Sequence, residues 1–276
     1  PVPKNCNCIV FAPTISLRLL YVKFQCFPNV FIKYILGIYY IKRNGGGNML
    51  HYERQGSGKT IVLIHGFLGS SALFKALTDD LSLHFDVITI DLPGHGKSSV
   101  ELESFTVEAY ANAIIDVLKY EKVEKAYWLG HSLGGYITLA ALANQLFPIP
   151  KAILLHSAVN ADTEETKEKR TSQQQAIKKD GVEPFVENVL PNFLAAKSSP
   201  KLTEKAKEFA KQASVEGLVA ALEAMKSRPD RQSFIDETTT PILIIEGIHD
   251  KVVPKIETRN EHITKVGVDS GHLGMI

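Results

Sequence analysis

Short apolar runs alternate with longer amphipathic segments along most of this 276-residue chain, and that alternation limits the fold more than any other feature. Each run is followed directly by a polar residue or a glycine. The runs occupy residues 60–64, 87–90, 126–129, 152–155 and 242–245. Strands that are apolar throughout are what a parallel sheet requires when helices cover both of its faces. The alternation therefore predicts an α/β fold with a doubly wound, mostly parallel sheet and right-handed crossovers.

Helices are predicted between these runs and in one long insertion. Amphipathic segments that could form helices occupy residues 71–83, 107–120 and 133–147. Residues 161–235 contain no strand-like run and are rich in Lys, Glu, Gln and Ala. Because a strand-like run follows this segment, it interrupts one sheet rather than forming a separate terminal domain. We expect an α/β core of residues 49–160 and 236–276 that carries a helical cap of residues 161–235.

Residues 1–48 differ sharply in composition from the rest of the chain. They contain six Lys and Arg residues, no Asp or Glu, and all three cysteines. Their best apolar stretch, residues 30–41, is shorter than the roughly 20 residues that span a bilayer, and no cleavage site of small residues follows an apolar core. We therefore expect no membrane association. Three glycines precede Met49, and their codons can spell a bacterial ribosome-binding site. Our hypothesis is that translation starts at Met49 and that residues 1–48 are a non-native or disordered segment.

Charge and cysteine content narrow the range of partners. A formal net charge of +1 provides no basic field that would attract a polyanion, so we expect a small-molecule substrate and no nucleic acid. Residues 49–276 contain no cysteine, which excludes disulfides and thiolate metal sites there and suits a cytoplasmic location. The sequence has no His-x-x-x-His pair and no Asp-rich calcium loop, so we expect no metal and no cofactor.

The segment Gly130-His131-Ser132-Leu133-Gly134 has a pattern typical of a nucleophilic serine. It follows an apolar run and opens a predicted helix, which is the context that the G-x-S-x-G pattern requires. A very sharp turn must lift the serine hydroxyl clear of the sheet, and the two glycines remove Cβ atoms that would collide there. Amide groups at the start of the helix favour negative charge that develops nearby. We predict that Ser132 is the nucleophile.

A second loop that contains glycine, residues 65–69, follows the first apolar run. A tetrahedral intermediate needs two hydrogen-bond donors where its oxyanion forms, and loss of one donor typically lowers the rate by about 10²- to 10³-fold. We predict that the backbone N–H groups of Phe67 and Leu133 are these donors. His65 is expected to brace the loop through hydrogen bonds. Residues 91–99 are expected to form a tight structural loop without catalytic groups.

The three segments 65–69, 91–99 and 130–135, in this order, resemble the α/β-hydrolase family of esterases and lactonases. The resemblance covers about residues 49–276 and implies the α/β-hydrolase fold with a helical cap insertion. It also implies that a strand-end carboxylate and then a histidine follow the serine in chain order. Proteins of this family normally continue past that histidine with a further helix. Because the chain stops at Ile276, we expect this C-terminal helix to be missing.

The acid and the base that the resemblance implies are Asp250 and His272. Asp250 lies on the loop that leaves the last apolar run, and His272 lies in a glycine-containing loop near the end of the sequence. The imidazole would take the serine proton and return it to the leaving group, while the carboxylate would fix the tautomer. Two other histidines compete for the role of base. His249 is expected to point away from Asp250, and His262 lies in a polar stretch interpreted as helical.

Substrate contacts are predicted in the cap. Phe185 and Phe193 belong to an apolar group that could cover the site as core or as pocket wall. Arg228 is a candidate for binding a substrate carboxylate, because a guanidinium group matches carboxylate geometry. The alternative for Arg228 is a solvated surface arginine.

Together these features predict a serine hydrolase that acts on a small carboxylic ester or lactone through an acyl-enzyme intermediate. Two alternatives remain open from the sequence. One is a non-hydrolytic protein that binds small molecules in the same pocket. The other is a lyase or carbon–carbon hydrolase that uses the same three residues. A dehalogenase of this fold is excluded, because its chemistry needs an aspartate where Ser132 stands.

Overall fold

The computed structural model describes residues 49–99, 102–195 and 198–276. The segment of residues 1–48, for which a non-native or disordered character was predicted, lies outside the described residues. The described ranges all fall within one compact unit, Ile38–Ile276. Within these ranges, no helix combines the length and the apolarity needed to cross a bilayer.

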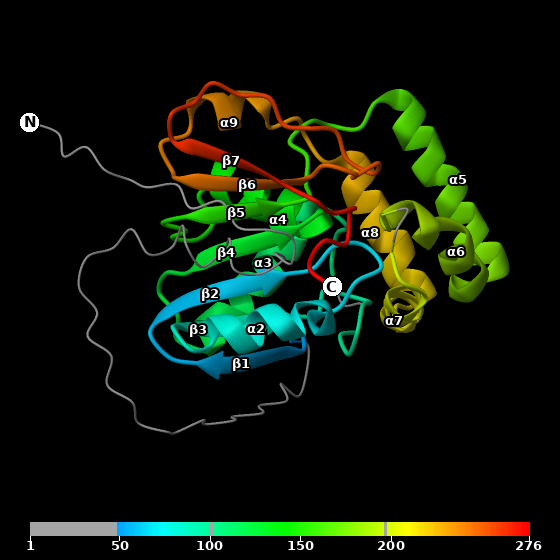
Figure 1. Ribbon diagram of the computed structural model, residues 1–276, viewed down its shortest axis with the longest axis horizontal. Helices are drawn as coiled ribbons and strands as arrows, with labels where there is room; N and C mark the ends of the chain where they lie inside the picture. Colours follow the sequence, from blue (N-terminus) through cyan, green and yellow to red (C-terminus); the bar gives the residue numbers. More distant parts are fainter. Residues whose placement is uncertain (1–48, 100–101, 196–197) are drawn as a thin grey trace, which may run out of the picture. The chain divides into compact units, whose positions relative to one another are not determined.

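A seven-stranded sheet forms the centre of the described part, in the order β1-β3-β2-β4-β5-β6-β7 (Figure 1). All neighbouring pairs are parallel except β1 and β3, which are antiparallel. The strands are β1 (Tyr52–Gly56), β2 (Lys59–Ile64), β3 (Phe85–Ile90), β4 (Tyr127–His131), β5 (Ala152–Leu155), β6 (Ile242–Gly247) and β7 (Ile263–Val268). The predicted mostly parallel α/β sheet is confirmed.

The five central strands coincide with the five apolar runs, whereas the two edge strands were not predicted. β1 and β7 are only partly buried, and polar residues occupy many of their positions. An edge strand faces solvent along one side, so it does not need to be apolar throughout. The interpretation of the stretch around His262 as helical is wrong, because His262 lies in a turn directly before β7.

Helices pack on both faces of the sheet (Figure 1). A short 3-10 helix, η1 (Ser71–Phe74), leads into α2 (Lys75–Leu81), which contacts β3, while α3 (Val107–Tyr120) and α4 (Leu133–Ala143) contact each other. Thr106 begins α3 by accepting a hydrogen bond from the N–H of Ala109. Helix α4 is buried on all sides, which explains why it is apolar around its whole circumference.

The helical insertion leaves the sheet after β5 and returns before β6. Its elements are α5 (Glu164–Asp180), α6 (Val182–Val189), η2 (Leu190–Phe193), α7 (Pro200–Ala210), α8 (Val215–Ser227) and α9 (Gln232–Glu237). Three of these helices begin after a hydroxyl residue that accepts a backbone hydrogen bond, namely Thr163, Ser199 and Ser214. Helices α5 to α8 contact one another and stand beyond one end of the sheet strands (Figure 1).

Helix α9 lies with the sheet rather than with the other inserted helices. The side-chain amide of Asn260, just before β7, donates hydrogen bonds to the carbonyl oxygens of Ile235 and Thr238. The expected end of the cap at residue 235 therefore falls inside a helix that is bonded to the core. We propose residues 161–231 as the cap, and the term is used for these residues below.

Candidate active site

The nucleophile candidate, Ser132, occupies the sharp turn between β4 and α4. Its backbone angles are φ 50° and ψ −114°, a conformation that a residue with a side chain rarely adopts. A Cβ atom at Gly130 would lie 2.2 Å from the carbonyl oxygen of Gly134, and a Cβ at Gly134 would lie 2.2 Å from that of Ile64. Both positions therefore require glycine, as the sequence pattern predicted.

Ser132, His272 and Asp250 form a continuous chain of hydrogen bonds. The Oγ of Ser132 lies 2.9 Å from Nε2 of His272, and Nδ1 of His272 lies 2.8 Å from Oδ2 of Asp250. The other carboxylate oxygen accepts a 2.8 Å bond from the N–H of Val252. Since a carboxylate only accepts, the proton of the imidazole is on Nδ1, and Nε2 is left to accept from the serine hydroxyl. This arrangement can deprotonate the serine.

The surroundings of Asp250 keep its carboxylate charged. Its side chain is 5% exposed, and burial alone would raise its pKa. The hydrogen bond and the charge of His272 outweigh burial, so the pKa of Asp250 lies below its ordinary value. A charged carboxylate at this position stabilises the imidazolium form of His272.

The loop after β2 lies directly against the nucleophile. A Cβ atom at Gly66 would come within 2.8 Å of the Cβ of Ser132, so glycine is needed for this close approach. Within the part of the chain that the structure describes, neither the N–H of Phe67 nor that of Leu133 donates a hydrogen bond to a backbone or side-chain group. Both groups remain available as oxyanion donors.

His65 braces this loop, as the sequence predicted. Its Nε2 accepts a 2.9 Å bond from the N–H of Leu92, and its Nδ1–H donates at 2.7 Å to the carbonyl oxygen of Gly66. Complete burial lowers the pKa of His65, which keeps the ring neutral. The side chain therefore connects the loops after β2 and β3 and has no free nitrogen for catalysis.

Residues 91–99 form a tight loop around the carboxylate of Asp91. This carboxylate accepts bonds from the N–H groups of Ser71 and Lys97 and from Nδ1 of His51. Gly96 has a positive φ of 53°, and a Cβ there would lie 2.5 Å from the Asp91 carboxylate. Burial opposes ionisation of Asp91, but these donors lower its pKa. The loop is structural, as expected.

His131 holds the loop of the candidate base, a role that the sequence did not indicate. Its Nε2–H donates a 2.8 Å hydrogen bond to the backbone carbonyl oxygen of His272. Burial, followed by the nearby His272 and His156, lowers the pKa of His131 well below its ordinary value. The residue between glycine and serine in the motif thus connects the loop of the candidate base to the turn of the candidate nucleophile. The motif alone gave no signal for this, because the contact joins residues far apart in sequence.

The other histidine next to the acid points elsewhere. Nε2 of His249 lies 2.8 Å from Oδ1 of Asp269, and the His249 side chain is largely exposed. The expectation that His249 points away from Asp250 is confirmed. His156, which the sequence did not single out, is the residue that lies beside the acid, with its Nδ1 4.0 Å from Oδ2 of Asp250.

Phe185 and Phe193 bring the cap to the site from two sides. The ring of Phe193 meets the ring of His272 edge to face at a centroid distance of 5.2 Å, and its carbonyl oxygen accepts from the N–H of Leu273. The ring of Phe185 meets that of Phe67 edge to face at 6.1 Å. Both cap residues are buried. Their contacts place apolar surface beside the base and beside the oxyanion loop.

Arg228 is neither solvated nor open to a substrate. Its guanidinium group donates to Oδ1 of Asp162 at 2.6 Å and to the carbonyl oxygens of Met225 and Asn160. The same group lies 4.1 Å from the centre of the Tyr136 ring. The alternative of a surface arginine is wrong, because only 8% of Arg228 is exposed. Its contacts join the two ends of the cap, so we do not include it in the proposed site.

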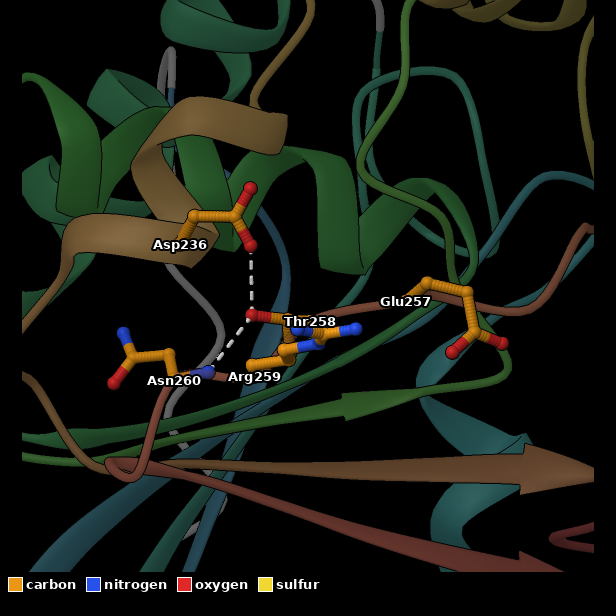
Figure 2. A pocket seen from close by; sticks show the side chains of 5 residues that line it. All are labelled: Asp236, Glu257, Thr258, Arg259 and Asn260. Atoms are coloured by element: carbon orange, nitrogen blue, oxygen red, sulfur yellow. Dashed lines mark hydrogen bonds between the residues drawn. The ribbon is translucent and has the colours of Figure 1, made fainter.

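A surface depression lies away from these residues, at the turn before β7 (Figure 2). Asp236, Glu257, Thr258, Arg259 and Asn260 line it. Thr258 donates through Oγ1 to Asp236 and accepts from the N–H of Asn260, so these bonds hold the turn together. Across the described residues, no three His, Cys, Asp or Glu side chains are grouped in a way that could hold a metal ion.

A serine, a histidine and a carboxylate thus meet where parallel strands of an α/β sheet end, and this combination is characteristic of a class of hydrolytic enzymes. A family model described as alpha/beta hydrolase fold matches residues 59–276. The chain therefore belongs to the α/β-hydrolase family and is a hydrolase. The fold and the family predicted from the sequence are confirmed.

The chain is also similar to individual hydrolases. The chain is 25% identical over 220 residues to the pimeloyl-[acyl-carrier protein] methyl ester esterase of Vibrio vulnificus (strain CMCP6). This match covers 74% of this chain and 81% of that protein. It is 28% identical over 219 residues to the putative carbamate hydrolase RutD of Agrobacterium fabrum, with 74% and 82% covered. A thermophilic esterase from Thermogutta terrifontis of known structure matches with a TM-score of 0.73 and 25% identity, with 86% and 92% covered.

Proposed function

We propose that this protein is a serine hydrolase that cleaves a small carboxylic ester or lactone through an acyl-enzyme intermediate. The observation that carries the proposal is the unbroken chain of hydrogen bonds from Ser132 through His272 to Asp250. Ser132 is the nucleophile, His272 the general base and acid, and Asp250 the residue that orients the base. The backbone N–H groups of Phe67 and Leu133 receive the oxyanion.

The reaction follows from the protonation state of this chain of groups. Nε2 of His272 takes the proton of Ser132 as Oγ attacks the carbonyl carbon of the substrate. The carbonyl oxygen becomes an oxyanion that the N–H groups of Phe67 and Leu133 stabilise. When the intermediate collapses, His272 returns the proton to the leaving alcohol oxygen and the acyl group stays on Ser132. Water activated by the same histidine then releases the acid.

The aromatic residues of the cap support a largely apolar substrate, and the relatives support attack on an acyl carbonyl group. Phe185 and Phe193 present aromatic surface to the oxyanion loop and to the base. Two of the relatives named above are esterases, and the third is a putative carbamate hydrolase. Attack on an acyl carbonyl group is common to all of these reactions. The choice of a carboxylic ester or lactone as substrate is our proposal for this chain.

Turnover of p-nitrophenyl acetate and butyrate tests the proposal. We expect Ser132→Ala to abolish turnover, whereas Ser70→Ala, which changes another buried serine, should leave it intact. The rate should fall in acid, because a protonated histidine cannot act as base. Turnover that survives in Ser132→Ala at the wild-type rate would reject the proposal.

A phosphonate directed at serine separates covalent catalysis from binding alone. We expect one phosphonyl group per chain, located by mass spectrometry on the peptide that contains Ser132. A protein that only binds its ligand would be stabilised thermally by esters without forming product or adduct. A panel of lactones and of substrates cleaved at a carbon–carbon bond, assayed in parallel, distinguishes ester chemistry from the other reactions that the same residues can perform.

A further inference from the structure

A second histidine lies beside the carboxylate of Asp250, on the side that His272 does not occupy. His156 follows β5 directly, has a positive φ of 46° and is 1% exposed. Its Nδ1 lies 4.0 Å from Oδ2 of Asp250, the oxygen that accepts from His272. The ring centroids of His156 and His272 are 6.4 Å apart. Two imidazole rings thus lie near one carboxylate oxygen, and only that of His272 is within hydrogen-bond distance of it.

Neither ring nitrogen of His156 has a hydrogen-bond partner within the described residues. The same is true of Oγ of Ser270, which is also buried. Buried polar groups are nearly always hydrogen-bonded, so two such orphans near each other call for an explanation. A Cβ atom at Gly274 would lie 2.5 Å from Nε2 of His156 and 2.5 Å from Oγ of Ser270. Gly274 therefore leaves space over Nε2, and the hydroxyl of Ser270 borders the same space.

The charges around His156 determine its form at neutral pH. The titratable groups that face it are Asp250, His272 and His131. Burial, and then the charge of His272, lowers the pKa of His156 to about 4, although Asp250 acts in the opposite direction. The ring is therefore neutral at pH 7 and carries a single N–H. The Asp250 carboxylate, which can only accept, favours placing that proton on Nδ1, and a hydroxyl near Nε2 can then donate to the bare nitrogen.

We propose that His156 is a positioning residue for the reaction, with its Nδ1–H directed at the Asp250 carboxylate and its Nε2 facing the hydroxyl of Ser270. Asp250 then stands between two serine–histidine pairs, Ser132–His272 and Ser270–His156. The first pair performs the chemistry, and the second holds the carboxylate and takes up part of its charge. This inference depends on the catalytic roles proposed above for Ser132, His272 and Asp250.

The pH profile of kcat/KM tests this role. Phenylalanine at position 156 removes the N–H dipole, so the carboxylate acts more fully on His272 and stabilises its protonated form. For His156→Phe we expect the acid limb of the profile to move to higher pH by about 0.3–0.5. We also expect kcat to fall about 5- to 20-fold with KM unchanged, because the carboxylate is held less well. His156→Gln keeps an N–H donor and should restore most of both properties.

His249→Phe is the matched control, because His249 adjoins Asp250 in the chain but bonds to Asp269. Its profile should match that of the wild type. A wild-type acid limb and a wild-type kcat in His156→Phe would overturn the proposal for His156. Failure of the proposed hydrolase function would show differently, as turnover that survives Ser132→Ala, so the two failures cannot be confused.

The tautomer of His156 can also be read in the unmodified full chain, where no variant has to fold. In protein labelled with ¹⁵N-histidine, long-range proton–nitrogen NMR spectra at pH 7 distinguish the two neutral tautomers. The signal of His156 is assigned by its loss in His156→Gln. We expect the proton on Nδ1. A proton on Nε2 would overturn the proposal, because Nδ1 would then present a lone pair to the carboxylate.

Discussion

The loops at the ends of the core strands and the helices of the cap are built in different ways. In the core, backbone touches backbone: Cβ atoms at Gly130 and Gly134 would lie 2.2 Å from carbonyl oxygens. In the cap, α6 and α7 are joined by side chains at the surface, such as the ion pairs of Lys207 with Glu187 and Lys211 with Glu183. The catalytic geometry is thus fixed by contacts that almost no substitution preserves. The cap depends on contacts that many substitutions can replace.

The largest effect should come from one carboxylate in a core loop. Asp250→Asn keeps the shape of the residue but places an amide where His272 needs an acceptor for Nδ1–H. We expect kcat to fall by about 10³- to 10⁴-fold with little change in thermal stability. Asp269→Asn, which alters an exposed partner of His249, is the control and should keep full activity. Equal activities in the two variants would contradict the assigned role of Asp250.

Alanine substitutions at two glycines compare the backbone of the core with that of the cap. A Cβ at Gly134 meets the carbonyl oxygen of Ile64, so Gly134→Ala should lower the free energy of unfolding by at least ~3 kcal/mol. Gly181 in the cap has a φ of 85° but no atom within 4 Å of an added Cβ. Gly181→Ala should therefore lower it by only about 1 kcal/mol. Urea unfolding measures both changes in the free energy of unfolding. A larger loss of stability in Gly181→Ala than in Gly134→Ala would contradict the difference between core and cap.

Between pH 6.5 and pH 4.5, lowering the pH should destabilise the core more than the cap, because residues 161–231 contain no histidine. Burial lowers the pKa of His95 to about 3, from an ordinary value of 6.5. Below pH 6.5 the unfolded chain binds a proton that the folded chain excludes. Stability is therefore complete above that pH and is lost as the pH falls toward 3.

We expect His95 to account for a loss on the order of 2 kcal/mol between pH 6.5 and pH 4.5. His95→Phe should flatten the dependence of the unfolding free energy on pH over this interval, and His249→Phe, at an exposed site, should not. Urea titrations at several pH values measure the slopes. If the unfolding free energy depends on pH with the same slope in the wild type and in His95→Phe, the buried ring of His95 does not contribute to this pH dependence.

The polar contacts of the cap should differ in their effects on stability, and the exposed one should have the smallest effect in this series. Arg228→Met removes a buried partner of Asp162, but Asp162 keeps its bonds to Arg170, so we expect a loss of only about 2 kcal/mol. Lys207→Met removes an exposed ion pair with Glu187 and should leave the thermal midpoint unchanged. The ratio of rates on neutral and carboxylate-bearing esters should not change in Arg228→Met. A lower rate on the charged ester alone would indicate that Arg228 does bind the substrate carboxylate.

The sequence predicted the central strands because each is buried on both faces and must be apolar throughout. Helix α3 coincides with the segment of residues 107–120 that its amphipathic pattern predicted. The edge strands β1 and β7 were not predicted, because they are partly exposed to solvent and therefore contain polar residues that interrupt the apolar pattern. The positions of Ser132, Asp250 and His272 were predicted and lie together, while their catalytic roles stay predictions.

Apart from the three residues to which the family resemblance pointed, contacts between distant segments could not be predicted from the sequence. Arg228 and Asp162 lie 66 positions apart, and nothing local to either residue indicates the pair. The place of His156 beside Asp250 depends on the pairing of β5 with β6, which follows only once the strand order is known. A lone histidine at the end of a strand carries no such information by itself.

The double contact of Phe193 with the loop of His272 has a consequence for the timing of turnover. One cap residue both shields the imidazole ring and accepts a backbone bond from Leu273. A movement of this part of the cap would break both contacts at once, so the ring of the proposed general base would be less shielded and its loop less firmly held. On the proposed mechanism, opening of the cap and proton transfer by His272 would therefore occur at different times.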